Sequence, residues 1–356
     1  SFDGSRGPYT AGGTGGGVGT NAELAASAPL TIGGSLWVAG PGGVMLGAAA
    51  DLDVGGELHV AGPISGEARL EVDHDAYVGG RLAVGELVVG GTMTVPAGTE
   101  ISVRGERDVA ASAEAPVVVA PPCGCGASDV VDVGAFVGRH RTAHDDATIG
   151  LDPGRFADYA GNERLELPCG RFYLSRLAGA GDVTIVVRGR VALFVGGDVH
   201  IDGTLIVDIA DSAELDLFVE GNLAVTGDLR LGSERSAARA RLYVGGRGTI
   251  ELSGEGFFAG NLYAPGAELV GSGPLEVFGS LFARRLAASA GVTVHYDTSV
   301  LRVRDECPPP SDPTCASCLD CSAGACVGGT CAPCTESTQC CAPLVCIAGE
   351  CRPDFI

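Results

Sequence analysis

The sequence predicts an all-β fold, a parallel β-helix followed by a small disulfide-rich C-terminal module. One sequence phrase recurs: a short apolar strand, a Gly-Gly or Glu-Gly step and a second short strand. Its copies lie at residues 30–38, 52–60, 76–84, 193–201, 217–225 and 242–250. Within each of two blocks the second glycines recur every 22 to 25 residues, which indicates a solenoid. Alternating apolar residues indicate strands, three to a turn. The third observation is that 11 of the 14 cysteines lie in residues 307–351.

The solenoid is expected over residues 29–304, after a Gly-rich N-terminal segment of residues 1–28. That segment is rich in Gly, Ser, Thr and Ala, a composition typical of a flexible or irregular lead-in. The first block then runs from about Leu30 to Val103, with a fourth copy of the phrase at residues 87–95.

An insertion at about residues 105–165 interrupts the repeat. It contains an Ala- and Pro-rich stretch, two cysteines and a stretch that predicts a short helix around Val131–Arg141. We expect this insertion to project from one face of the solenoid, where insertions often carry function. The second block begins near Leu165 and continues to Val303.

The closing part of the second block carries a fairly specific signature. It consists of Phe258-Ala-Gly-Asn-Leu-Tyr-Ala-Pro265, Gly271-Ser-Gly273 and His295-Tyr-Asp297, preceded far upstream by Phe2-Asp3, Gly7-Pro-Tyr9, Thr20-Asn21 and Leu167-Pro-Cys-Gly-Arg-Phe-Tyr173. Over roughly residues 1–300 the chain resembles a bacterial extracellular domain of uncharacterised function, often found after type IV minor-pilin-like N-termini or in secreted surface proteins. The resemblance implies a right-handed β-helix at the cell surface and brings no catalytic residues.

The C-terminal region begins with a Pro-rich linker at residues 305–314, followed by a disulfide-rich module at residues 315–356. Cysteines spaced five apart at 321, 326 and 331 are echoed at 341, 346 and 351, which predicts two tandem copies. Some spacings, such as Cys331-x2-Cys334, suit zinc. The tail has no histidine, however, and its adjacent Cys340-Cys341 pair is knottin-like, so we expect disulfides.

All 14 cysteines are expected in disulfides: Cys123, Cys125, Cys169, Cys307, Cys315, Cys318, Cys321, Cys326, Cys331, Cys334, Cys340, Cys341, Cys346 and Cys351. The tail (residues 307–351) contains 11 cysteines and the preceding body contains three, so both numbers are odd. The simplest pairing has five tail bridges, one body bridge and one between them; a bridge between chains is the alternative. We expect the body bridge to join Cys123 or Cys125 to Cys169. Cys123 and Cys125 have one residue between them, whereas redox dithiols usually have two.

Charge and hydropathy restrict the partners. The net charge is −21 and every one of the 23 basic residues is arginine, so nucleic acid and anionic lipid would be repelled. No run of 18 apolar residues could span a membrane. The dense cysteines predict an oxidising, extracellular or cell-surface location.

Two acidic or histidine-containing motifs resemble catalytic sites of β-helix enzymes. Alternation places Glu71, Asp73 and Asp75 on one outward strand face, which we interpret as a solvated face rather than a catalytic one. His295-Tyr-Asp297 follows the last strand, where we expect a terminal cap.

The insertion holds candidate metal ligands at His140, His144, Asp145 and Asp146. If the segment is helical, the two histidines share a face, which suits a divalent metal. No Glu lies between them as in zinc proteases, and we expect a capped turn. We therefore predict no metal site and no cofactor, although calcium at a single corner stays an open alternative.

The sequence thus predicts an extracellular structural protein that is not an enzyme. We expect it to self-assemble as a surface or filament subunit, with itself as partner in a homopolymer or homo-oligomer. The alternative is an adhesin that binds a glycan or protein ligand, and a carbohydrate-active enzyme is the least favoured class.

Overall fold

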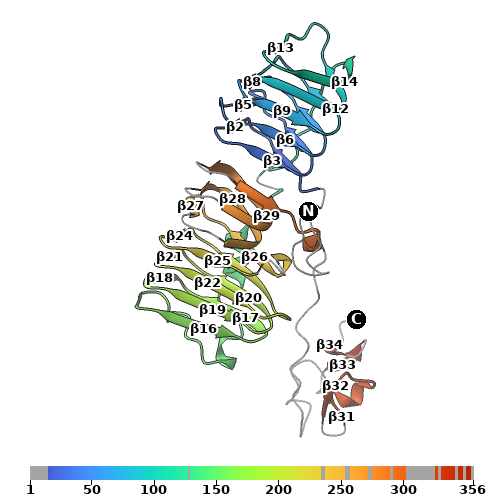
Figure 1. Cartoon of the computed structure of the whole chain (residues 1–356). Coiled ribbons are helices and arrows are strands. Elements are labelled where there is room, and N and C mark those ends of the chain that lie inside the picture. The colour runs from blue at the N-terminus through green and yellow to red at the C-terminus, as the bar shows by residue number, and fades with distance from the viewer. Residues whose placement is uncertain are drawn as a thin grey trace. The chain divides into compact units, whose positions relative to one another are not determined.

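The computed structural model describes residues 15–126, 129–233, 237–252, 257–271, 275–288, 292–301, 325–327, 330–340, 344–347 and 350–353. The chain divides into two compact units, unit 1 (Ser1–Val303) and unit 2 (Arg304–Ile356). Unit 1 contains two blocks of solenoid turns, block 1 (residues 15–115) and block 2 (residues 159–301), joined by a connector (residues 116–158) (Figure 1).

The strands of block 1 are short. They are β1 (Val18–Thr20), β2 (Leu24–Ala26), β3 (Leu30–Ile32), β4 (Leu36–Val38), β5 (Val44–Leu46), β6 (Leu52–Val54), β7 (Leu58–Val60), β8 (Ile64–Gly66), β9 (Arg69–Val72), β10 (Ala76–Val78), β11 (Leu82–Val84), β12 (Glu86–Val95), β13 (Ile101–Val103) and β14 (Arg107–Glu114). The connector contains helix α1 (Val133–Arg139) and the 3₁₀ helix η2 (Asp146–Thr148).

Block 2 has longer strands and two further 3₁₀ helices. Its elements are β15 (Tyr159–Ala160), β16 (Glu163–Leu167), β17 (Gly170–Leu174), β18 (Leu177–Ala180), β19 (Val183–Val187), β20 (Arg190–Val195), β21 (Val199–Asp202), β22 (Leu205–Ile209), β23 (Glu214–Val219), β24 (Leu223–Val225), β25 (Leu229–Leu231), η3 (Ala237–Arg239), β26 (Ala240–Val244), β27 (Thr249–Leu252), β28 (Phe257–Gly271), β29 (Leu275–Ala288), β30 (Val292–His295) and η4 (Thr298–Leu301).

The predicted parallel β-helix is confirmed. Most strands of both blocks pair in parallel with the strand three places further along the chain, as β4 does with β7 and β20 with β23. Three strands therefore make one turn, and three parallel ladders run along each block. Each turn contacts only the turns before and after it, which is the defining property of a solenoid.

The core consists of columns of aliphatic side chains, one residue from each turn. In block 1, Leu36, Leu58, Ala76 and Met93 occupy one column, and all are at most 2% exposed. In block 2 the equivalent columns include Leu193, Leu217, Leu242 and Leu262. A fully buried side chain of this kind stabilises the fold by about 2 kcal/mol, so the repeated columns are the main source of stability.

The glycines of the recurring phrase lie where backbones of successive turns meet. A Cβ on Gly34 would lie 2.7 Å from the backbone nitrogen of Gly17, and one on Gly56 would lie 2.7 Å from the backbone carbon of Gly34. No side chain fits at such distances. The repeat therefore requires glycine for close approach of the turns.

The solenoid begins earlier than the sequence predicted. Within the expected Gly-rich lead-in, Val18–Thr20 pairs with β4 and Leu24–Ala26 pairs with β5, so the first full turn starts there. Their three-residue strands were too short to stand out from the glycines around them. Residues 1–14 lie outside the described residues.

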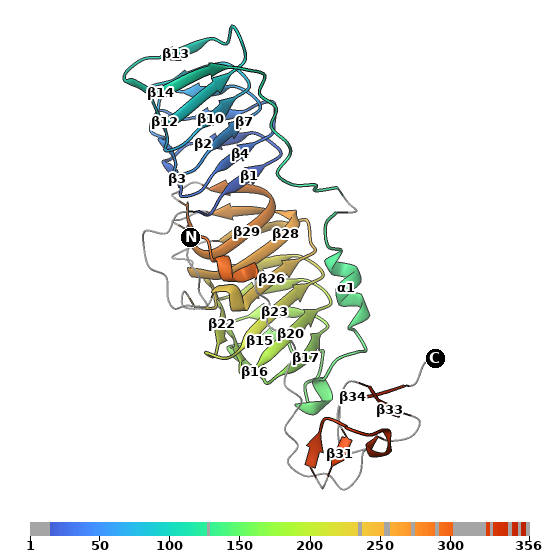
Figure 2. The same ribbon diagram turned by 90° about the vertical axis from the view of Figure 1, so that its right-hand side faces the viewer.

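The insertion predicted at residues 105–165 is shorter and does not project. Its first part is β14, which pairs with β12, and its last part is β15, which pairs with β18. The remaining connector runs back along unit 1 from the far end of block 1 (Figure 2). Asn21 exchanges hydrogen bonds with the backbone of Cys123, and the Val131 N–H donates to the Tyr263 hydroxyl at 2.8 Å.

The connector allows the blocks to stack in reverse chain order. The first turn of block 1 lies beside the last strands of block 2 in both views (Figures 1 and 2), and a Cβ on Gly16 would lie 3.1 Å from that of Tyr296. The predicted helix is confirmed as α1. Its N-cap is Asp132, whose side chain accepts a hydrogen bond from the Ala135 N–H.

The described residues of unit 2 form two antiparallel hairpins and one 3₁₀ helix. The hairpins are β31 (Ala325–Val327) with β32 (Thr330–Ala332), and β33 (Leu344–Ile347) with β34 (Glu350–Pro353); η6 spans Ser337–Gln339. Each hairpin places two cysteines opposite one another, Cys326 with Cys331 and Cys346 with Cys351, which matches the tandem spacing in the sequence. The predicted linker at residues 305–314 lies outside the described residues.

Candidate functional site on the outer face of block 2

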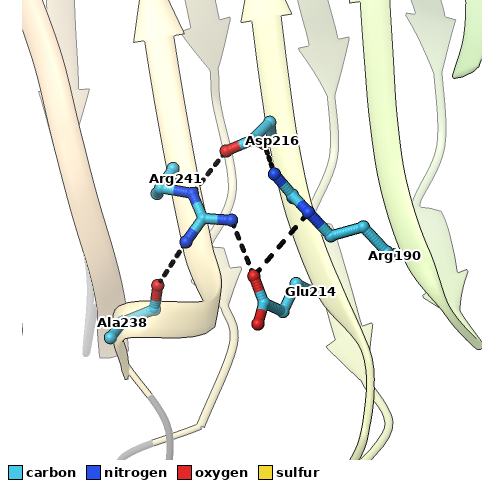
Figure 3. Close-up of polar contacts among 5 residues, drawn as sticks. All are labelled: Arg190, Glu214, Asp216, Ala238 and Arg241. Carbon is cyan, nitrogen blue, oxygen red and sulfur yellow. Dashed lines mark hydrogen bonds and ion pairs between the residues drawn. The ribbon is translucent and has the colours of Figure 1, made fainter. Parts of the chain in front are cut away.

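The outer face of β20, β23 and β26 carries a group of four charged side chains, here called the ion network. Arg190 begins β20, Glu214 and Asp216 lie on β23, and Arg241 lies on β26. The register sets Arg190 opposite Glu214 and Asp216 opposite Arg241, so opposite charges meet across neighbouring turns. In Figure 3 the two arginines lie on opposite sides of the two carboxylates.

Each carboxylate of the ion network contacts both arginines. Arg241 donates to Glu214 at 2.9 Å through Nη2 and to Asp216 through Nε, while Arg190 Nε lies 3.8 Å from Glu214 Oε2 and its Nη2 donates to Asp216. Arg241 also donates to the carbonyl oxygen of Ala238 in η3 at 2.9 Å. The network thus joins three successive turns and one 3₁₀ helix.

The ion network is largely removed from water. Arg241 and Asp216 are 8% exposed and Glu214 is 9% exposed. Burial alone would lower the pKa of Arg241, but the hydrogen bonds and negative charges of Asp216 and Glu214 outweigh it and hold that pKa above its ordinary value. With both carboxylates bound by guanidinium groups, the arrangement suits an ionic brace rather than an acid–base pair.

A column of outward-facing aromatic rings runs beside the ion network. Phe194 and Phe218 stack at 5.2 Å between ring centres, Phe218 and Tyr243 at 4.5 Å, and Tyr263 and Phe282 at 5.1 Å, each pair within 11° of parallel. Burial, reinforced by the charge of Asp216, raises the pKa of Tyr243. Block 1 has a similar column of Trp37, His59 and Tyr77.

The flat faces of these rings contact one another within each stacked pair. Because the rings stack along the solenoid axis, their flat faces contact the next turn and their edges point outward. At the start of the block 2 column, helix α1 adds Phe136 over Phe218 at 4.8 Å, and His140 stacks on Phe194 at 4.0 Å. Stacking of this kind stabilises the structure by about 1 kcal/mol per pair. A ligand that stacks on an aromatic face finds few free faces here.

The His295-Tyr-Asp297 motif connects to the ion network through a single residue, Ala238. Asp297, which is fully buried, accepts hydrogen bonds from the N–H groups of Ala238 at 3.1 Å and Ser299 at 2.9 Å. The carbonyl of the same Ala238 accepts from Arg241. The motif therefore fastens η3 and η4 to block 2. It does not cover an open end as predicted, because the first turn of block 1 follows at Gly16.

The four candidate metal ligands of the connector do not converge. Helix α1 ends at Arg139, so His140 and His144 do not share a helix face; His140 caps the helix and its Nδ1 lies 3.0 Å from the Phe136 carbonyl. His144 stacks on Tyr173 instead. In the part of the chain that the structure describes, no three His, Cys, Asp or Glu residues are placed to hold a metal ion.

Asp145 and Asp146 anchor the connector to β17, and the Asp145 side chain does not cap its own 3₁₀ turn as expected. The Asp145 carboxylate accepts from the Arg171 N–H at 2.8 Å, and that of Asp146 accepts from the Tyr173 N–H at 2.9 Å. Asp146 is only 2% exposed, and its Oδ2 lies 3.1 Å from His144 Nδ1. Burial raises the pKa of Asp146, although the Tyr173 N–H and His144 act in the opposite direction.

The prediction that Glu71, Asp73 and Asp75 share one strand face is wrong. Strand β9 ends at Val72, so Asp73 and Asp75 lie in the turn that follows rather than on the strand with Glu71. Asp75 accepts from the Thr92 N–H of the next turn at 2.6 Å. The turn residues close a corner of the solenoid, because a carboxylate there can satisfy a backbone donor one turn away.

The predicted bridge between Cys169 and the Cys123–Cys125 pair is also wrong. Cys123 and Cys125 bond to each other, with Cα atoms 5.1 Å apart. Asn21 holds Cys123 at the first turn of block 1, whereas Cys169 lies between β16 and β17 in the first turn of block 2. Cys334 bonds to Cys346 in unit 2, and Cys169, Cys326 and Cys340 are disulfide-bonded as well.

The sequence reasoning missed the ion network, although a signal was present. Asp216 and Arg241 are 25 residues apart, which is one turn, and each interrupts an otherwise apolar strand at an outward position. Opposite charges spaced by the repeat period predict contact across adjacent turns, as cross-strand pairs do.

Comparison with known families covers the same region. Residues 139–303 match a family model described as a domain of unknown function (DUF7305). The match includes all of block 2, the ion network and Asp297, and leaves block 1 and unit 2 outside. No curated protein and no solved structure shows significant similarity to the chain. The bacterial, pilin-associated and knottin-like parts of the resemblance stay predictions.

Proposed function

We propose that the chain is an extracellular structural protein whose unit 1 serves as a stiff scaffold. The observation that carries this proposal is the returning connector, which contacts the first turn of block 1 at Asn21 and the side of block 2 at Tyr263 and Phe218. A solenoid without such contacts depends on neighbouring turns alone. Here one segment fastens the first turn of block 1 to the side of block 2, which suits a load-bearing or spacing role.

The extracellular location is supported by the disulfides of both units. The pair Cys123–Cys125 and the bridge Cys334–Cys346 require an oxidising environment to persist. The structure contributes one further fact on membrane contact: among its described helices, none has the length and apolar character needed for a membrane span.

Filament growth by stacking solenoid ends is not part of this proposal. Leu151 and Phe156 of the connector, 8% and 0% exposed, pack into the core at the first turn of block 2 and cover that end. Polymerisation through both ends would need this cover to open. Adhesin and enzyme functions receive less support, because the aromatic faces and both carboxylates of the ion network already have partners in the chain.

Immunogold electron microscopy of intact cells, with an antibody against unit 1, tests the proposal. We expect label on an extracellular structure that is lost or altered when the gene is deleted. Label inside the cells, or an unchanged cell surface after deletion, would overturn it. A glycan screen with the purified chain provides the contrast, and glycan binding lost in Tyr263→Ala would favour the adhesin instead.

A further inference from the structure

The far end of block 1 presents a strand edge. Strand β14 pairs in parallel with β12, and no other described strand pairs with it. All eight residues from Arg107 to Glu114 are exposed except the half-buried Val109. A strand edge of this length offers free backbone N–H and C=O groups to another strand.

Two opposite charges lie near the ends of β14 at positions that face the solenoid interior. Arg107 is level with Leu87 of β12, and Glu114 is level with Val95. Those two β12 residues are 1% and 6% exposed and belong to the core. Neither Arg107 nor Glu114 has an ion-pair partner among the described residues. In the last turn, Arg107 and Glu114 therefore occupy the positions that core residues occupy in the turn before.

Strand β14 also turns a corner at its middle. The first half of β12 pairs with β9 and its second half with β10, two strands on different faces. The register of β12 with β14 shifts between Val89 and Thr92, which leaves Ala110 as the residue of β14 at the bend. Any strand that pairs along the whole of β14 must bend at the same place.

A second β14 strand, run antiparallel about a two-fold axis, meets both requirements. The register that sets Ala110 opposite Ala111 brings the two bends within one residue of each other, and it also sets Arg107 opposite Glu114 twice. The remaining pairs, Asp108 with Ala113 and Val109 with Ser112, contain no like charges. Self-complementarity of this kind is what a symmetric dimer interface requires.

We propose that β14 is a homodimer interface, in which two copies of the chain pair their β14 strands antiparallel and exchange two Arg107–Glu114 ion pairs. The assembly closes at two copies, because the other end of the solenoid is covered by Leu151 and Phe156. The interface is small, so the dimer should dissociate in the micromolar range. The inference goes beyond the scaffold role and does not depend on it.

Sedimentation velocity of the full, unreduced chain over a range of concentrations tests the proposal. We expect a monomer–dimer equilibrium with no larger species, weakened by high salt. Arg107→Glu or Glu114→Arg alone places like charges together twice and should raise the dimer Kd by about tenfold or more. The double variant Arg107→Glu/Glu114→Arg should restore dimerisation. Arg230→Glu, the same charge change on an exposed residue of block 2, is the matched control.

Hydrogen exchange locates the interface. Amides of β14 should gain protection at concentrations that favour the dimer, while those of block 2 should not change. A chain that stays monomeric at all concentrations would overturn the proposal, and Arg107 and Glu114 would then act as inward charges that protect the edge. A dimer unaffected by Arg107→Glu, or growth beyond two copies, would overturn it equally. None of these results would bear on the cellular test of the scaffold role.

Discussion

Block 1 and block 2 use the same three-strand turn and both stack aromatic rings on an outer face. Among the described residues, only block 2 adds a buried ion network and a helix that covers its rings. Block 1 is held by aliphatic columns, glycine corners and corner carboxylates such as Asp75. Block 2 adds the ion network, helix α1 over its aromatic column, and the Asp297 contact that joins η3 to η4. The two therefore differ in how much of their stability lies outside the repeat itself.

The difference between the blocks follows from the length of their strands. In block 1 the turns are nearly equivalent, and each strand is three or four residues long until β12. In block 2 the longer strands leave outward positions that can bury charge and aromatic rings under an added element. The match to the family model covers block 2 and not block 1, and it includes the ion network and Asp297 but not Phe136 of helix α1.

The largest expected effect comes from glycines that both blocks require. Gly43 in block 1 and Gly279 in block 2 have positive φ, and a Cβ on either would lie 1.9 Å from a carbonyl oxygen of the neighbouring turn. Gly43→Ala and Gly279→Ala should each destabilise their own block by about 3 kcal/mol or more. Hydrogen exchange followed separately in the two blocks measures this.

Gly98→Ala is the matched control, because Gly98 also has positive φ but has open space around its Cα. It should cost only about 1 kcal/mol, the conformational part of the effect. Equal loss of protection in both blocks after Gly43→Ala would show that the blocks unfold together and would remove the distinction between them.

The next effect should be confined to block 2. Arg241→Met leaves Glu214 and Asp216 buried with only Arg190 beside them, and should destabilise block 2 by about 3 kcal/mol. Urea unfolding monitored by hydrogen exchange measures the change. Arg81→Met is the control in block 1. It removes an ion pair with Glu100 whose side chains are 58% and 66% exposed, and should cost less than about 0.5 kcal/mol. Similar costs for the two variants would contradict the bracing role.

A smaller effect is expected where helix α1 of the connector packs on block 2. Phe136 packs against Phe218 at 4.8 Å and against Phe194 at 5.9 Å, and Phe136→Ala should destabilise this region by about 2 kcal/mol. Limited proteolysis of the connector should accelerate accordingly. Val118→Ala, at a connector residue that is 91% exposed, should change nothing. An unchanged cleavage rate in Phe136→Ala would mean that α1 is held by other contacts.

The smallest effect is a pH dependence at the covered end of block 2. Because burial raises the pKa of Asp146, folding favours its protonated form. The stability contributed is full below the pKa of an unfolded aspartate, about 4, and is lost as the pH rises through the raised folded value. In Asp146→Asn, whose amide oxygen can still accept from Tyr173, this loss should disappear. Thermal unfolding from acidic to neutral pH measures it, and parallel pH profiles of the two proteins would contradict the assignment.

The strand period, the glycine corners and the short helix could all be predicted from the amino-acid sequence. These features are local or repeat at a fixed interval, so the phrase at residues 30–38 and its copies predict parallel pairing of successive turns. The cysteine spacing likewise predicted two tandem copies, and the structure has two similar hairpins around Cys326 and Cys346. The start of the solenoid at Val18 could not be predicted, because its first strands have only three residues each and lie among glycines.

The order of the blocks, the path of the connector and the ion network depend on contacts that form only in the folded chain. Whether block 1 stacks after block 2 depends on contacts between residues as distant in sequence as Gly16 and Tyr296, which no local pattern encodes. The pairing of Cys123 with Cys125 followed from the connector's position beside Asn21. The four charges of the ion network became a site only when three turns brought Arg190, Asp216 and Arg241 into contact, because burial and pairing are properties of the assembled turns.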